Sequence, residues 1–116
     1  MKIPVLSYHS INDDNSPLSL KINFFENQLK YLKKKGFKTI NFDETDKKEN
    51  KTIIITFDDG YKDILYNALP ILKKYNFKAT SFLVTNFIGD YNYWDKKKVD
   101  YNKKELMNET DINEWI

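Results

Sequence analysis

The chain has 116 residues, of which 41% are hydrophobic and 31% are charged, and its formal net charge is +2. This length has room for one domain, and the apolar content is enough to build a core, so a disordered chain is excluded. No apolar run approaches the roughly 18 residues of a membrane span, the start lacks the apolar segment of a signal peptide, and every basic residue is a lysine. We therefore expect no membrane span in this chain, and no nucleic-acid partner, because the arginine forks that read phosphate and guanine are missing.

The first third of the chain predicts a strand followed by a helix. Residues 3–8 form a short apolar run, which is typical of a buried strand. Asn23 followed by Glu26 resembles a capping box, and the helix that starts there should end at Gly36. Its apolar face consists of Phe25, Leu29 and Leu32.

Two further strands and a second helix are expected next. Residues 37–42 predict a strand, and the polar residues 43–51 predict a surface loop. Residues 52–57 give the strongest strand signal, because they are rich in β-branched side chains and apolar on both faces, as a central parallel strand must be. The helix that follows should bend at Pro70 and end with Asn76 in the left-handed position. Its apolar positions are Ile64, Leu65, Ala68, Leu69, Leu72 and Tyr75.

Residues 78–84 predict another strand, and the order of elements then indicates an α/β fold. Strands that alternate with helices imply right-handed crossovers and a parallel sheet or barrel. In such folds functional groups collect at the carboxyl ends of the strands, which here are Tyr8 and His9, Asp58 and Asp59, and the loop after Val84. Four phenylalanines are expected in the core: Phe24, Phe25, Phe37 and Phe82.

The last residues predict one more helix, starting with Asp111 and Glu114. Its apolar face would begin with Ile112, Trp115 and Ile116. A helix of barely one turn is not stable alone in water. We therefore expect a domain that is truncated after about half its length.

The chemistry should centre on Asp58 and Asp59, which precede Gly60. Two adjacent carboxylates at the end of a buried strand repel each other unless a cation lies beside them, and a divalent metal would supply one. One carboxylate can then bind the ion while its neighbour accepts a proton from water. Taken alone, the tripeptide is typical of an Asp-Gly turn, but a hairpin needs an antiparallel strand next, and the following residues have helical periodicity.

Two other uses of such acids fit the spacing less well. A phosphatase of the haloacid-dehalogenase type needs an aspartate where Gly60 stands. A response-regulator receiver needs an acidic pair at the end of the first strand, where this chain has Tyr8 and His9.

The segment Thr56-Phe57-Asp58-Asp59-Gly60-Tyr61 resembles the first motif of the polysaccharide deacetylase family, also called the NodB-homology or carbohydrate esterase 4 group. Three other segments agree with that family in the same order. Residues 4–10 resemble its opening strand, residues 67–72 its next helix, and residues 78–82 the strand after that. The similarity covers most of the chain.

This resemblance implies an incomplete, distorted (β/α) barrel of the NodB-homology type, with residues 1–116 as the N-terminal part of a single domain. It implies a metal-dependent hydrolase that removes N-acetyl groups from an amino-sugar polysaccharide. By similarity, Asp58 is the general base and Asp59 is a ligand of a divalent ion, usually zinc, with cobalt or nickel as alternatives. Members of the family often work outside the cytoplasm.

Three more residues are candidates for lining the substrate pocket: His9, Tyr61 and Trp94. His9, in a family-like Tyr-His pair, is either a support or substrate contact or a surface histidine at a strand end. Tyr61 and Trp94 are either walls against which a sugar ring stacks or ordinary half-buried aromatics. Asp95 follows Trp94 as in the family's Trp-Asp segment, and helix capping is its simpler role.

The family's second motif, a His-Ser/Thr-x-x-His segment that supplies two imidazole ligands, is not among these 116 residues. A catalytic zinc normally has three protein ligands and a water, and His9 is the only histidine in the chain. We therefore expect the chain alone to bind metal weakly and to be inactive. The alternatives are a non-catalytic remnant or carbohydrate-binding module of the same fold, and an unrelated α/β phosphotransfer protein.

Overall fold

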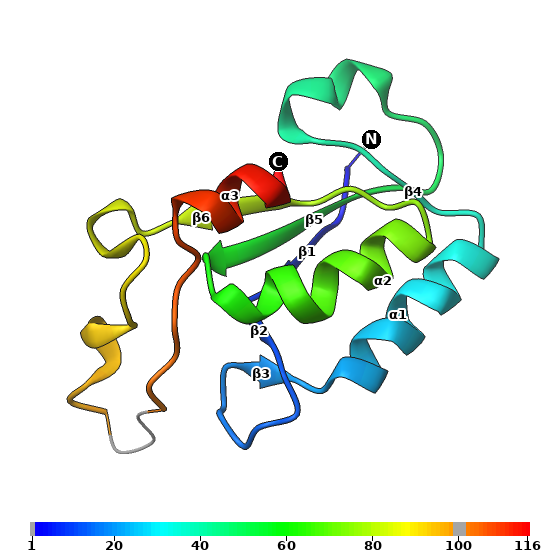
Figure 1. Ribbon diagram of the computed structural model, residues 1–116. Coiled ribbons are helices and arrows are strands. Elements are labelled where there is room, and N and C mark those ends of the chain that lie inside the picture. The colour runs from blue at the N-terminus through cyan, green and yellow to red at the C-terminus, as the bar shows by residue number, and fades with distance from the viewer. Residues whose placement is uncertain (1, 99–101) are drawn as a thin grey trace.

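The computed structural model describes residues 2–98 and 102–116 of the chain. Strands alternate with helices along most of it, as the sequence predicts (Figure 1). In chain order the elements are β1 (Val5–Tyr8), β2 (Ser10–Ile11), β3 (Ser19–Leu20), α1 (Ile22–Lys34), β4 (Lys38–Thr39), β5 (Thr52–Asp59), α2 (Leu69–Lys74), β6 (Thr80–Leu83) and α3 (Glu109–Trp115).

The central sheet is parallel and is built around β5. On one side β5 pairs with β1, and on the other it pairs with β4 near its start and with β6 near its end. The register places Tyr8 beside Phe57 and Leu83 beside Asp59. The carboxyl ends of β1, β5 and β6 therefore meet at one edge of the sheet, where the sequence predicts the functional groups.

β5 is the central strand because it is paired along both edges, and both of its faces are covered. Residues 52–57 are all buried, and burial falls off at Asp58 and Asp59. Helices α1 and α2 lie side by side next to the sheet (Figure 1). The buried core consists of Ile11, Phe25, Leu29, Ile53, Ile55, Phe57, Ile64, Leu65, Ala68, Ile71, Leu72, Phe77 and Met107.

Helix α1 begins at Ile22 rather than at Asn23, and its N-cap residue, Lys21, makes no side-chain capping bond, so the predicted capping box is wrong. Glu26 instead accepts hydrogen bonds from Lys74 Nζ at 2.6 Å and Tyr75 Oη at 3.0 Å. A carboxylate that meets an ammonium group has a stronger partner than a backbone amide. The pair joins α1 to the end of α2.

The strand predicted over residues 37–42 is shorter, and only Lys38–Thr39 pair with β5. A short 3-10 helix, Phe42–Lys47, follows where the sequence predicts an open loop. The reason is local: Glu44 Oε1 accepts a hydrogen bond from the amide of Asn41 at 3.0 Å and so stabilises the first turn. Glu44 also pairs with Lys78 at 2.6 Å.

The second helix changes its geometry just before Pro70, where the sequence predicts a bend. A wider π turn, Ile64–Ala68, precedes α2, and Pro70, which lacks an amide hydrogen, stands in the first turn of α2. Asn76 has a φ of 56° and ends the helix as predicted.

Two of the four phenylalanines predicted in the core are exposed. Phe25 is fully buried, but Phe24 is 57% exposed and Phe82 is 51% exposed. Phe24 lies on the outer side of α1, and Phe82 contacts the ring of Phe42 with a centroid distance of 5.9 Å. Aromatic side chains are often buried, but residue type alone does not say which face of an element is covered.

The last helix begins two residues earlier than predicted. Asn108 is its cap: Asn108 Oδ1 accepts from the amide of Asp111 at 2.8 Å, and the Asp111 carboxylate accepts from the amide of Asn108 at 3.0 Å. Trp115 packs edge-on against Phe57 at 5.7 Å. Contact with the core thus holds a helix that would not form alone.

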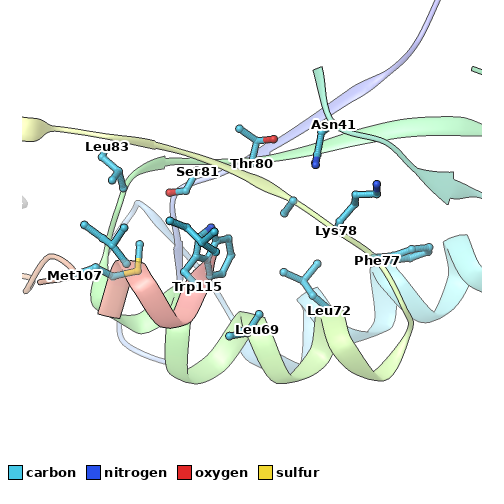
Figure 2. Close-up of a pocket in the computed structure, with 13 residues that line it drawn as sticks. Asn41, Leu69, Leu72, Phe77, Lys78, Thr80, Ser81, Leu83, Met107 and Trp115 are labelled. Atoms are coloured by element: carbon cyan, nitrogen blue, oxygen red, sulfur yellow. The ribbon is translucent and has the colours of Figure 1, made fainter. Parts of the chain in front are cut away.

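A cavity of about 550 Å³ lies between β6, α2 and α3 (Figure 2). Its lining is mainly apolar and includes Leu69, Leu72, Phe77, Leu83, Met107, Ile112 and Trp115. None of the predicted site residues is among its lining residues. In the part of the chain that the structure describes, no helix has the length and apolar character needed to cross a membrane.

Candidate active site

His9 and Asp58 lie together at the carboxyl edge of the sheet. His9 directly follows β1, and Asp58 lies near the end of β5. Because these strands are parallel neighbours, their register brings the two side chains close together. His9 Nε2 lies 3.8 Å from Asp58 Oδ2, and each side chain is 39% exposed. The carboxylate can therefore reach both the imidazole and water.

Asp59 stands beside this pair in a strained backbone conformation. Its φ is 77°, a left-handed value that costs a residue other than glycine of order 1–3 kcal/mol. Its Oδ2 lies 3.5 Å from the hydroxyl of Tyr61. Burial raises the pKa of Asp59, and the charges of Asp58 and Asp95 raise it further. A cation near the two carboxylates would relieve this repulsion.

Gly60 continues the turn with a φ of 73°. A Cβ at this position would lie 2.6 Å from Leu83 Cδ2, so any side chain here would force the Leu83 side chain to shift. Both observations explain why a glycine stands at this tight turn after the paired acids.

Tyr61 does not line a pocket, because its side chain is fully buried. Its ring therefore has no face to offer a sugar, which corrects the predicted stacking wall. Burial raises the pKa of Tyr61, and the carboxylate of Asp59 raises it further. The side chain of Asn92 is close enough to the hydroxyl to lower that pKa in part. Tyr61 thus connects the acids to the segment that follows β6.

Asp95 belongs to this neighbourhood and does not cap a helix as predicted. It is buried at the end of a short 3-10 turn, Tyr93–Asp95, and its Oδ1 lies 2.7 Å from Lys98 Nζ. It is close enough to raise the pKa of both Asp59 and Tyr61. Sequence reasoning missed Asn92 altogether, although polar residues at positions 92 and 95 flank two aromatics.

Trp94 lies on the outer side of the same turn. It is 37% exposed, and its ring centroid lies 5.5 Å from that of Phe87. The structure therefore places Trp94 at the surface beside Asp95. Its predicted contact with substrate stays a prediction.

Within residues 2–98 and 102–116, no group of three or more histidine, aspartate or glutamate side chains is arranged to hold a metal ion. Asp58, Asp59 and His9 supply suitable donor atoms, but a catalytic zinc needs three protein ligands in a common geometry. The described residues alone do not fit a complete metal site.

Comparison with known proteins shows which fold carries this arrangement. Residues 45–112 match the family described as Polysaccharide deacetylase. The chain belongs to the polysaccharide deacetylase family. The matched region contains the paired aspartates and the segment around Asp95, so family membership and candidate site coincide. Membership of this family also removes the basis for the alternative that the chain is an unrelated α/β phosphotransfer protein.

The similarity extends to individual deacetylase relatives. The YxkH protein of Bacillus subtilis (strain 168) is 39% identical over 105 residues, which cover 84% of this chain and 37% of that protein. The poly-beta-1,6-N-acetyl-D-glucosamine N-deacetylase of Staphylococcus epidermidis is 34% identical over 94 residues, 76% of this chain and 32% of that protein. The structure of the Streptococcus pyogenes deacetylase PplD, in complex with acetate, superposes with a TM-score of 0.77 and 26% identity, covering 99% of this chain and 52% of that one. The chain thus spans about a third of the length of the two curated relatives and about half of the PplD chain.

Proposed function

We propose that this deacetylase chain supplies the general base of a hydrolase that removes N-acetyl groups from an amino-sugar polysaccharide. The observation that carries the proposal is the Asp58 carboxylate, 3.8 Å from His9 and beside Asp59, at the carboxyl edge of a parallel sheet. The name of the staphylococcal relative supports an N-acetylated amino-sugar polymer as the substrate class.

The geometry suits Asp58 to proton transfer. Its carboxylate is part-exposed, so a water molecule can approach it and give up a proton as the water attacks the acetamide carbon. His9, on the other side of the carboxylate, can hold it in orientation. Asp59 would be a ligand of a divalent ion, zinc with cobalt or nickel as alternatives, whose further ligands lie outside the described residues. Such an ion supplies Lewis-acid chemistry when bound.

The sheet supports a wider inference about architecture. Among the described residues β1, β4 and β6 all pair in parallel with β5, and parallel pairing of this kind is what a distorted (β/α) barrel requires. We infer that residues 1–116 are the N-terminal part of a single NodB-like domain, because the chain covers about a third of its curated relatives.

A chimera tests this function directly. The aligned region of the staphylococcal N-deacetylase is replaced by this chain, and acetate release from an N-acetylated glucosamine oligomer is measured. We expect activity in the chimera and a loss of at least about a hundredfold in its Asp58→Asn variant, since general-base catalysis contributes 10²–10⁴. An active Asp58→Asn chimera would refute the assignment of the base.

A second candidate is a non-catalytic carbohydrate-binding module of the same fold, which the incomplete donor set favours. Isothermal titration of the chain with Zn²⁺ bears on the choice between the two candidates, because a complete catalytic site would bind the metal tightly. We expect weak binding that Asp59→Asn weakens further. Tight, stoichiometric binding would contradict our ligand count and would favour a complete catalytic site.

A further inference from the structure

Residues 104–107 run alongside the turn that follows the paired acids, and we call them the strap. The amide of Lys62 donates to the carbonyl of Glu105 at 2.9 Å, and the amide of Met107 donates to the carbonyl of Gly60 at 2.9 Å. In Figure 1 the strap is the orange segment that passes the end of β5 and leads into α3. The backbone that follows the paired acids is therefore bonded to residues far along the chain.

A buried lysine anchors the strap. The Lys104 side chain is only 6% exposed, and its Nζ lies 2.5 Å from Asp14 Oδ2 and 3.5 Å from Asp63 Oδ2. A lysine is rarely buried to this extent unless its charge is paired, because an unpaired ammonium group loses its hydration without compensation. The strap is thus attached to the rest of the fold by charge as well as by backbone hydrogen bonds.

Asp63 extends this anchor to the neighbouring strand. Its Oδ2 also accepts hydrogen bonds from Ser10 Oγ and from Asn12 Nδ2, the latter at 3.2 Å. Ser10 directly follows His9, and Asp63 lies four residues after Asp59. One carboxylate therefore joins the strap to the residue after His9 and to the segment after the paired acids.

The turn needs such support because its backbone is strained. Asp59 has a φ of 77°, and a strained residue keeps its conformation only where the surrounding contacts over-determine it. The strap supplies contacts of this kind, and Lys104 fixes the strap. Without the ammonium group, Asp14 and Asp63 would lose the cation that they share, and burial of their charges would favour separation of the strap from the turn.

We propose that Lys104 is a positioning residue for the deacetylation reaction: its buried ammonium group, held between Asp14 and Asp63, keeps the strap against the turn and so aims Asp58 and Asp59. The proposal rests on the proposed function, because it concerns how the two acids of that function are held. Lys104 acts through the turn and not on the substrate. A misplacement of catalytic groups by about 1 Å costs a rate about a hundredfold, so the anchor should affect the rate more than substrate binding.

Amide exchange in the 116-residue chain tests the anchor without requiring catalysis. Lys104→Met removes the charge and keeps an unbranched side chain. We expect the amides of Lys62 and Met107 to exchange roughly tenfold faster in this variant, relative to the amides that join β1 and β5, because local opening leaves the rest of the sheet closed. The proposal fails if these two amides exchange at the parental rate, or if all amides speed up by the same factor.

The chimera described above tests the consequence for the reaction. We expect Lys104→Met to lower kcat by about ten- to a hundredfold and to leave KM within about twofold, since the acids are misplaced while substrate contacts remain. Lys104→Arg keeps the charge, and the cavity of about 380 Å³ lined by Lys104, Asp14 and Asp63 has room for a guanidinium group, so this variant should keep most of its kcat. An unchanged kcat in Lys104→Met, or an equal loss in Lys104→Arg, would overturn the proposal.

Lys103→Met is the matched control. Lys103 is exposed and adjacent in the chain, and its Nζ lies 4.0 Å from the ring centroid of Tyr91. This variant should leave kcat, KM and the exchange of both amides unchanged, and an effect as large as that of Lys104→Met would refute the positioning role. Circular dichroism checks that each variant is folded at the assay temperature.

The two experiments separate this proposal from the proposed function. An inactive chimera, or one that stays active with Asp58→Asn, counts against the proposed function alone, and the exchange of the Lys62 and Met107 amides still decides whether Lys104 holds the turn. Loss of activity in Asp58→Asn together with no effect of Lys104→Met supports the base and rejects the positioning role.

Discussion

Asp59 and Gly60 both adopt left-handed backbone conformations at the end of β5, with φ values of 77° and 73°. Two such residues in succession turn the chain sharply, and Tyr61 can then pair with Leu106 in an isolated antiparallel bridge. The strain at Asp59 is therefore stored where the candidate chemistry lies, and the hydrogen bonds around Tyr61 maintain it.

At this turn, Gly60→Ala should destabilise the fold by roughly 2–4 kcal/mol, because strain at positive φ adds to a clash with Leu83. Gly36→Ala is the matched control: its φ is also positive, at 85°, but the added Cβ would meet its nearest neighbour at 3.9 Å. Urea denaturation should show a loss near 1 kcal/mol for the control. Equal losses in both variants would mean that β6 does not pack on Gly60 as described.

Glu44 predicts a pH dependence. Lys78 and the amide of Asn41 lower the pKa of its carboxyl from 4.5 to about 2. Because the folded-state pKa is the lower one, Glu44 contributes stability that is complete above pH 4.5 and disappears as the pH falls toward 2. Glu44→Gln should therefore lower the Tm at pH 6, and lower it less at pH 3.

The Glu44 prediction has its control in Glu49→Gln, which removes an exposed carboxylate 3.8 Å from Lys38. Surface pairs of that kind contribute little, so its effect on Tm should be smaller at both values of pH. A Tm difference for Glu44→Gln that grows as the pH falls would contradict the sign of the pKa shift.

At the scale of the elements, α3 shows how a short helix is held. Its seven residues are too few for independent stability, yet both ends have partners: the Asn108 cap at the start and the contact of Trp115 with Phe57 near the end. Anchoring to the core thus substitutes for length.

If the cap matters, Asn108→Ala should cost about 1 kcal/mol, because the amide of Asp111 loses its acceptor. Thr110→Ala, at an exposed position in the same turn, should be neutral within about 0.5 kcal/mol. Denaturation measures the cost, and amide exchange should show faster opening of residues 109–115 in the first variant alone. Similar exchange in both variants would argue that packing by itself holds α3.

At the scale of the whole molecule, strand β6 is paired along one edge only among the described residues, and it also lines an apolar cavity. Among the described strands, β6 pairs only with β5, and Thr80, Ser81 and Leu83 of β6 line the cavity shown in Figure 2. Ser81 Oγ is buried at this surface and has no hydrogen-bond partner within the described chain. A buried hydroxyl without a partner carries an uncompensated loss of hydration.

It follows that Ser81→Ala should leave the free energy of unfolding unchanged or raise it by up to about 1 kcal/mol. Ser7→Ala is the contrasting variant, because Ser7 Oγ lies 2.9 Å from Thr56 Oγ1 on the opposite side of β5. That variant should lose about 1 kcal/mol in the same denaturation experiment. A comparable loss for Ser81→Ala would show that its hydroxyl has a partner.

The candidate site could be predicted only in part. Asp58, Asp59 and His9 were found because each stands at the end of a strand with a strong local signal, and parallel pairing brings such ends together. The predictions for Tyr61 and Asp95 were wrong because their surroundings come from residues 92–98 and 102–106, parts of which return to the end of β5 from far along the chain. Nothing in the local pattern of either residue records that return.

Local chemistry in the sequence was sufficient for the central strand, the turn at Gly60 and the end of the second helix at Asn76, since each depends on residues close together in the chain. The order of four such segments was sufficient for membership of the polysaccharide deacetylase family. Which side chains are buried was decided by the folded state, which places Phe24 and Phe82 at the surface and Tyr61 inside. The pairing of charged groups also depended on the folded state, because Glu26 contacts Lys74 only when α1 and α2 pack together. Periodicity reports which residues share a face, and only tertiary packing decides what covers that face.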